Sequence, residues 1–102
     1  MYSKIRNSFL VLALALVVGC STALYMPTSV DADRAGVSTE RLMVGRTLYI
    51  SKCGSCHNLH LPEQYTQKQW QKVMPTMQKK AKITDEESKQ IADFLLARSK
   101  TE

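Results

Sequence analysis

Apolar side chains recur at helical spacing in three segments of the chain, and no segment alternates with the two-residue period of a β-strand. The pattern predicts one helix over residues 39–51, a second after Thr66 and a third from Thr84. The second and third begin as capping boxes, Thr66-x-x-Gln69 and Thr84-x-x-Glu87. The sequence therefore predicts an all-α domain of about three helices.

Each predicted helix carries an apolar stripe that would face a core. The stripes hold Leu42, Gly45, Leu48 and Tyr49 in the first helix, Trp70, Val73, Met74 and Met77 in the second, and Ile91, Phe94 and Leu95 in the third. Pro75 lies within the second stripe, where it removes one hydrogen bond and disfavours helical geometry at the preceding residue. We therefore expect an interruption there.

The start of the chain has the pattern of an export signal. Lys4 and Arg6 precede an unbroken apolar run from Phe9 to Val18, which is shorter than the about 20 residues that span a bilayer. The run ends at Cys20 in a sequence that resembles a bacterial lipobox, which implies cleavage of residues 1–19 and lipidation of Cys20. The alternative is an uncleaved anchor or an ordinary signal peptide, with Cys20 incidental.

The lipobox resemblance implies a compartment. The lipidated protein would lie in the bacterial periplasm, and Ser21 after the cysteine favours the outer membrane of a Gram-negative cell. Residues 20–37 are mostly polar or small, without a period of 2 or 3.6, and we interpret them as a lipidated cysteine followed by a flexible tether. The folded domain would then occupy residues 38–102.

The sequence Cys53-Gly54-Ser55-Cys56-His57 has the C-x-x-C-H spacing that attaches c-type haem. Two intervening residues place both thiols on one side of a turn, where they reach two vinyl groups at one porphyrin edge. The imidazole of His57 follows directly and can ligate the iron as its proximal ligand. The sequence therefore predicts one covalent haem c, bound through Cys53, Cys56 and His57.

Two other interpretations of the paired cysteines fit less well. A redox dithiol of this spacing belongs in a βαβ setting, and the sequence has no strand pattern. A structural zinc site needs four Cys or His ligands, and His60 is the only other histidine. A domain of this size also rarely builds enough core alone, so a covalent porphyrin would stabilise it.

A glycine and an aromatic residue precede the first haem cysteine by eight and four residues, as Gly45 and Tyr49, and Ile91 and Phe94 lie three residues apart in the last helix. With these positions, residues 38–99 resemble a small class I monohaem cytochrome c. The resemblance implies a compact fold of about three helices around the haem. It also implies that the first and third helices cross at Gly45.

The resemblance extends to the distal ligand of the iron. The stretch from Trp70 to Met77 is similar to the W-x-x-V-x-x-x-M sequence of compact bacterial members, which implies Met77 as the distal ligand. Met74 followed by Pro75 resembles the Met-Pro ligand of other members and is the alternative. We expect His60 to be a solvated surface residue, because it lies only three residues after the proximal ligand.

Charge adds a hypothesis about partners. The formal charge of +5 falls to +3 once Lys4 and Arg6 leave with the signal peptide. The lysines near the supposed distal segment either form an ordinary solvated face or steer an acidic redox partner; they are Lys68, Lys72, Lys79, Lys80 and Lys82. A nucleic-acid partner is improbable in this compartment.

Together these patterns indicate a lipid-anchored electron carrier rather than an enzyme. It would act as a monomer or as a subunit of a redox complex, with redox proteins and the membrane as its partners. Two alternatives stay open: a haem-based gas sensor in which Met77 is displaceable, and a haem subunit fixed within a larger membrane complex.

Overall fold

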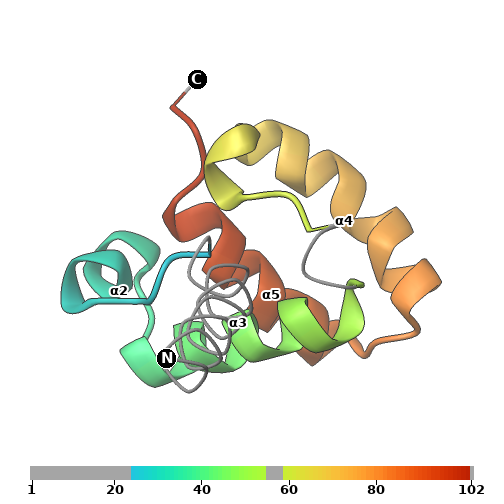
Figure 1. The fold of residues 1–102 in the computed structure, drawn as a ribbon, viewed down its shortest axis with the longest axis horizontal. Helices are drawn as coiled ribbons and strands as arrows, with labels where there is room; N and C mark the ends of the chain where they lie inside the picture. Colours follow the sequence, from blue (N-terminus) through green and yellow to red (C-terminus); the bar gives the residue numbers. More distant parts are fainter. Residues whose placement is uncertain (1–23, 55–58, 102) are drawn as a thin grey trace, which may run out of the picture.

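Two helices far apart in the sequence pack across each other to form the framework of the molecule (Figure 1). They are α3 (Thr39–Lys52) and α5 (Asp85–Ala97), and α4 (Gln67–Ala81) packs on α5. The computed structural model describes residues 24–54 and 59–101. Within these residues the regular elements are all helical, which confirms the all-α prediction.

The predicted capping boxes set the starts of α4 and α5. The Thr66 hydroxyl accepts a hydrogen bond from the Gln69 backbone N–H at 3.2 Å, and the Gln69 side chain accepts one from the Thr66 N–H at 2.9 Å. Thr84 and Glu87 exchange the same pair of bonds. Each box satisfies two N–H groups that a helix start would otherwise leave without partners.

The expected interruption at Pro75 does not occur, because α4 runs through it from Gln67 to Ala81. Pro75 lies on the exposed side of the helix, whereas Met74 before it is only 8 % exposed. Packing of Met74 in the core outweighs the local preference against helical geometry there.

The predicted crossing at Gly45 is confirmed. A Cβ atom added at Gly45 would lie 2.1 Å from the Gln90 carbonyl oxygen and 3.0 Å from Phe94 Cβ. The backbones of α3 and α5 therefore approach so closely that only glycine fits. Tyr49 and Ile91 are buried beside this contact, as the resemblance implied.

We expect Gly45→Leu to lower the free energy of unfolding by about 3 kcal/mol, the upper end of the usual cost of overpacking, because the added atoms meet α5 backbone. Denaturant unfolding followed by circular dichroism measures the loss. Val44→Leu is the matched control, since Val44 is exposed on the same helix. Equal stability of the two variants would contradict the crossing.

The interpretation of residues 24–37 as a flexible tether is wrong. This segment, which we call the N-terminal strap, contains a short helix, α2 (Ser29–Ala35), and packs against α3 and α5. Leu24 and Tyr25 are 4 % and 8 % exposed. The Tyr25 ring stacks on Phe94 with centroids 4.6 Å apart, and its hydroxyl donates to the Phe94 carbonyl oxygen. The folded part therefore includes Leu24 and does not begin at Ser38.

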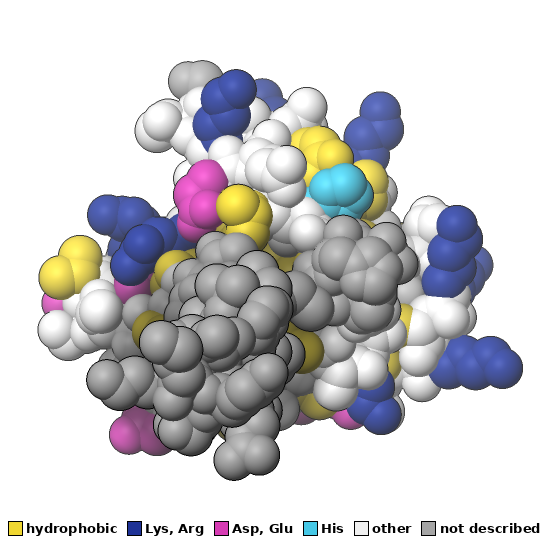
Figure 2. All heavy atoms as spheres, viewed as in Figure 1, with side chains coloured by type: hydrophobic (Ala, Val, Ile, Leu, Met, Phe, Trp, Pro, Cys, Tyr) yellow, Lys and Arg dark blue, Asp and Glu magenta, His cyan; other side chains and the backbone are white. Residues whose placement is uncertain are grey.

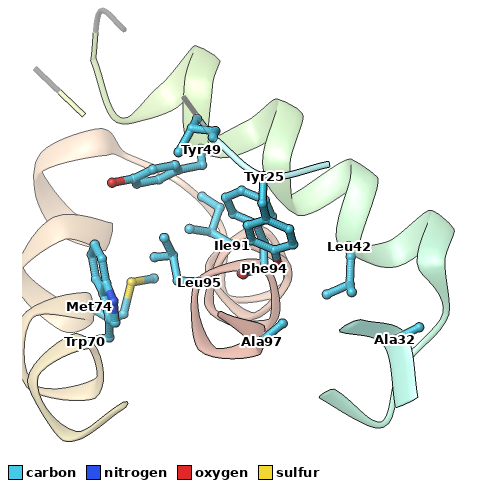
Figure 3. Close-up of a cluster of buried hydrophobic side chains, with 11 residues drawn as sticks. Tyr25, Ala32, Leu42, Tyr49, Trp70, Met74, Ile91, Phe94, Leu95 and Ala97 are labelled. Carbon is cyan, nitrogen blue, oxygen red and sulfur yellow. Dashed lines mark hydrogen bonds between the residues drawn. The ribbon is translucent and has the colours of Figure 1, made fainter. Parts of the chain in front are cut away.

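The core is shared by the strap and the three longer helices (Figure 3). Tyr25 and Phe94 lie face to face between α3 and α5, and Trp70 and Met74 approach α5 from α4 (Figure 3). The buried apolar residues are Leu24, Tyr25, Ala32, Leu42, Tyr49, Trp70, Met74, Ile91, Phe94, Leu95 and Ala97. The strap thus supplies side chains to the same core as the three predicted helices.

An ion pair between the buried Asp31 and the partly exposed Arg98 fastens the strap to the end of α5. Asp31, 2 % exposed, accepts hydrogen bonds from Arg98 at 2.7 and 3.2 Å and from the backbone and hydroxyl of Thr28. The bond from Arg98 is the main reason that the pKa of Asp31 is lowered to about 2. The Arg98 guanidinium also lies 4.6 Å from the centre of the Tyr25 ring.

We expect Asp31→Asn to lower the free energy of unfolding at pH 7 by about 2 kcal/mol. The pKa of Asp31 falls from about 3.9 in the unfolded chain to about 2 in the fold, and the corresponding free energy is discounted because Arg98 is partly exposed. Because the folded-state pKa is depressed, the stabilisation is complete above pH 4. It disappears as the pH falls towards 2. Chemical denaturation at several pH values should therefore show parent and variant converging in acid, with Asp33→Asn as the exposed control.

Candidate functional site

The first predicted haem cysteine lies at the end of α3. Cys53 is the C-cap residue, and its backbone N–H donates to the Tyr49 carbonyl oxygen at 3.1 Å. Its side chain is partly buried, and burial raises the pKa of the thiol. Gly54 follows with φ of +125°, a conformation that side chains rarely adopt. Helix α3 thus ends in a turn at the attachment motif.

The other predicted residues of the motif lie outside the described residues. These are Cys56 and His57, in the segment 55–58, and the same holds for the predicted lipidation site, Cys20, in the segment 1–23. The ligand assignments of Cys56 and His57 and the lipidation of Cys20 stay predictions.

Two hydrogen bonds hold the chain where it leaves the motif. The Tyr49 hydroxyl of α3 donates to the His60 carbonyl oxygen at 2.7 Å, and the Trp70 indole N–H of α4 donates to the Pro62 carbonyl oxygen at 2.9 Å. Both donors are buried, and burial raises the pKa of Tyr49 to about 12. The segment from His60 to Pro62 is therefore fixed between α3 and α4.

Two hollows border this part of the molecule, and Met77 lines both. The larger, of about 550 Å³, is lined by His60, Tyr65, Gln69, Trp70, Lys72, Val73 and Met77. The smaller, of about 330 Å³, is lined by Lys52, Cys53, Gly54, Met77, Lys80 and Ala81. Cys53 and the candidate distal ligand Met77 therefore share one hollow.

The two candidate methionines occupy different environments. Met74 is 8 % exposed and points from α4 towards Leu95 of α5 (Figure 3). Met77 is only partly buried and faces both hollows. The single apolar stripe predicted for this helix thus divides: Trp70 and Met74 enter the core, whereas Val73, 43 % exposed, and Met77 line the hollow.

These residues fit a haem group. The hollows fall in the usual size range of ligand pockets, roughly 300–1,000 Å³. A thiol lies at the edge of one, a thioether between the two, and an exposed valine offers an apolar wall. A third hollow, of about 790 Å³, lies elsewhere and is lined by Arg34, Ala35, Gln67, Asp93, Leu96, Ala97, Ser99, Lys100 and Thr101, none of which ligates haem iron or bonds its vinyl groups.

Sequence reasoning missed some residues at this site. His60 is exposed, as expected, but it also borders the larger hollow, where its ring packs edge-on to Tyr65 at 5.3 Å. Lys52 borders the smaller hollow, although it lies outside the lysine cluster predicted around the distal segment. Its position directly before Cys53 was the available signal.

Basic side chains gather near the candidate site. Lys52, Lys72 and Lys80 line the hollows, and Figure 2 shows Lys and Arg side chains projecting over α4. Of these, Lys72 and Lys80 belong to the predicted cluster. The described residues thus place positive charge beside both Cys53 and Met77.

A family model described as dihaem cytochrome c matches residues 49–102, from the last turns of α3 through the attachment motif, α4 and α5. The family description names two haems, whereas this sequence contains one C-x-x-C-H motif. No curated protein and no solved structure matches. The family match confirms the c-type cytochrome resemblance, but not its assignment to the monohaem class I.

Proposed function

We propose that this chain, which belongs to the dihaem cytochrome c family, carries single electrons by means of one covalently attached haem c. The proposed haem count follows from the chain itself, because two thioether bonds consume Cys53 and Cys56 and leave only Cys20. A pyridine haemochrome assay against protein concentration should give one haem per chain.

The observation that carries the proposal is the position of Met77 in the hollow that Cys53 borders. In this arrangement Cys53 and Cys56 would hold the porphyrin, His57 would be the proximal ligand and Met77 the distal one. When bound, the haem iron supplies a one-electron couple, and a thioether ligand favours its ferrous form.

A closed distal position distinguishes an electron carrier from a haem enzyme or a gas sensor, because the enzyme and the sensor each need an open site on the iron. The test is the absorption spectrum of the purified protein in both redox states, together with exposure of the reduced form to carbon monoxide. Reversible one-electron titration without a carbon monoxide adduct supports the carrier. A stoichiometric adduct on the parent protein would favour the sensor.

The family description favours one second candidate. The family is named for two haems, whereas this chain has one attachment motif. The chain would then be a haem subunit that works beside another haem protein. Chromatography in mild detergent distinguishes this subunit from a free carrier. Stable co-elution with a second haem-staining chain would favour the subunit.

The lysines beside the hollows support docking of an acidic redox protein. We expect Lys72→Glu with Lys80→Glu to slow electron exchange with an acidic partner protein several-fold at low ionic strength, because steering depends on the local charge. Stopped-flow measurements across a salt series should show the difference vanish at high salt. Lys100→Glu, at an exposed position that lines neither hollow, is the control; an equal effect there would indicate net charge alone.

The proposed location is the periplasm, with a lipid on Cys20 holding the protein at a membrane. The sequence pattern of residues 1–20 supports this location, because a short apolar run directly precedes Val17-Val18-Gly19-Cys20. Among the described residues, no helix has the length and apolar character needed to cross a bilayer. A lipid with two or more acyl chains would give stable anchoring.

A further inference from the structure

We propose that the N-terminal strap seats the folded domain directly on the membrane surface, with Met26 and Val30 against the lipid headgroups and the haem site at the opposite end of α3. The inference rests on the proposed lipidation of Cys20. It goes beyond that proposal because it assigns a membrane-contacting face and a fixed orientation.

The length of chain between the lipid and the fold is the first argument. Leu24 is 4 % exposed, and its carbonyl and that of Tyr25 accept hydrogen bonds from Arg46 at 3.5 and 3.1 Å. The fold therefore holds the chain from Leu24 onward. Three residues separate Cys20 from Leu24, so their Cα atoms lie at most about 14 Å apart. The headgroup layer itself takes up about 5–8 Å of that length.

The strap resists being pulled away from the domain. The paired Asp31 and Arg98 side chains lie 2.7 Å apart, and Tyr25 lies between Arg98 and the Phe94 ring, 4.6 Å from each. In addition, Arg34 donates to the Ala97 carbonyl oxygen at 3.3 Å. The segment between Cys20 and the folded domain therefore cannot lengthen unless the strap breaks these contacts with α5.

The surface next to Leu24 is suited to an interface with lipid. The described residues include four exposed large apolar side chains, and two of them belong to the strap: Met26 at 55 % and Val30 at 62 %, against Val44 at 44 % and Val73 at 43 %. Apolar, basic and acidic side chains all appear at the surface over α2 (Figure 2). The strap thus carries the two most exposed large apolar residues of the described chain.

Helix α3 sets the distance between this face and the haem site. The strap runs into its N-terminal end, Arg46 near its middle holds the carbonyl groups of Leu24 and Tyr25, and Cys53 caps its C-terminal end. Seven residues from Arg46 to Cys53 rise about 10 Å along the helix. Figure 1 shows α2 at one end of the long axis and the end of α4 at the other. The smaller hollow lies at the Cys53 end of α3 and the end of α4, away from α2, so we expect it to stay accessible to a partner protein.

Site-specific cross-linking of the full-length, haem-loaded protein tests this orientation. The photoreactive amino acid p-benzoylphenylalanine replaces Met26 or Val30 in one pair of variants and Val44 or Thr76 in the control pair; Thr76 is exposed on α4 and lines neither hollow. Each variant is reconstituted in phosphatidylethanolamine–phosphatidylglycerol vesicles, and peptide mass spectrometry detects lipid adducts. We expect adducts at Met26 and Val30 to exceed those at the control positions at least several-fold.

The second part of the experiment lengthens the segment between Cys20 and Leu24. Insertion of ten Gly/Ser residues between Cys20 and Leu24 should reduce the adducts at Met26 and Val30 to the level of the control positions, whereas the same insertion after Thr101 should leave them unchanged. Equal lipid adducts at all positions, insensitivity to the insertion, or protein–protein adducts at Met26 and Val30 in place of lipid would overturn the proposal.

Intact mass of the same samples separates this inference from the proposed anchor. Acylated Cys20 without lipid adducts on the strap would overturn the membrane contact and leave the lipid anchor in place. An amino terminus other than acylated Cys20 would overturn the anchor and, with it, the contact.

Discussion

Replacing Cys53 and Cys56 together by alanine is expected to abolish covalent haem. Thioether bonds survive denaturation, so the parent should keep peroxidase-active haem on a denaturing gel and the double variant should keep none. The expected loss extends to the fold. A domain this small has little core to spare, and the hollows beside Met77 would lose the group proposed to fill them.

Cys20→Ala is the matched control for this experiment. It removes the remaining cysteine of the chain and should leave the haem stain intact, because Cys20 lies outside the attachment motif. Haem that leaves the parent protein on acid–acetone extraction would contradict the attachment itself. Staining that persists in the double variant would contradict it too.

The framework of the fold was predictable because it depends on local signals. Capping boxes at Thr66 and Thr84 reach only three residues along the chain and set two helix starts. The crossing of α3 and α5 at Gly45 was predictable for a different reason. Its spacing from the haem cysteine, together with the Ile91 and Phe94 pair, matches a known family arrangement. Only glycine fits there, because any Cβ atom at this position would come within 2.1 Å of α5 backbone.

The strap was missed because its stability is not local. Leu24 and Tyr25 precede any described helix, and α2 has only seven residues, too few for its apolar spacing to form a pattern. Its main attachment joins Asp31 to Arg98, 67 residues later in the chain. Two weaker signals were present: Thr28 three residues before Asp31, and Gly36, which ends α2 with φ of +69°.

The candidate site was predictable in its chemistry but not in its geometry. The residue types of the C-x-x-C-H motif and the spacing from Trp70 to Met77 are visible in the sequence. The division of the α4 stripe between core and hollow is not, because a helical period gives the width of an apolar face but not the two surfaces that share it. Met74 and Met77 are three residues apart and belong to the same stripe, yet Met77 borders both hollows and Met74 is buried in the core.

Met77→Ala is expected to change the redox chemistry of the protein. Without its thioether the ferric protein should lose the weak far-red band typical of methionine-ligated haem. The reduced protein should then bind carbon monoxide, and the reduction potential should fall, because water or an adventitious base favours ferric iron more than a thioether does. Absorption spectroscopy and potentiometry measure all three changes.

Met74→Ala distinguishes a ligand from a packing residue on the same helix. Met74 lies in the core, so its loss should cost about 2–5 kcal/mol of folding free energy while the far-red band persists. The reverse pattern would place the ligand at the Met74-Pro75 pair and leave the electron carrier intact. If neither substitution affects the band, or the parent lacks it, the thioether ligand is wrong. His60, which borders the same hollow as Met77, would then be the residue to replace next.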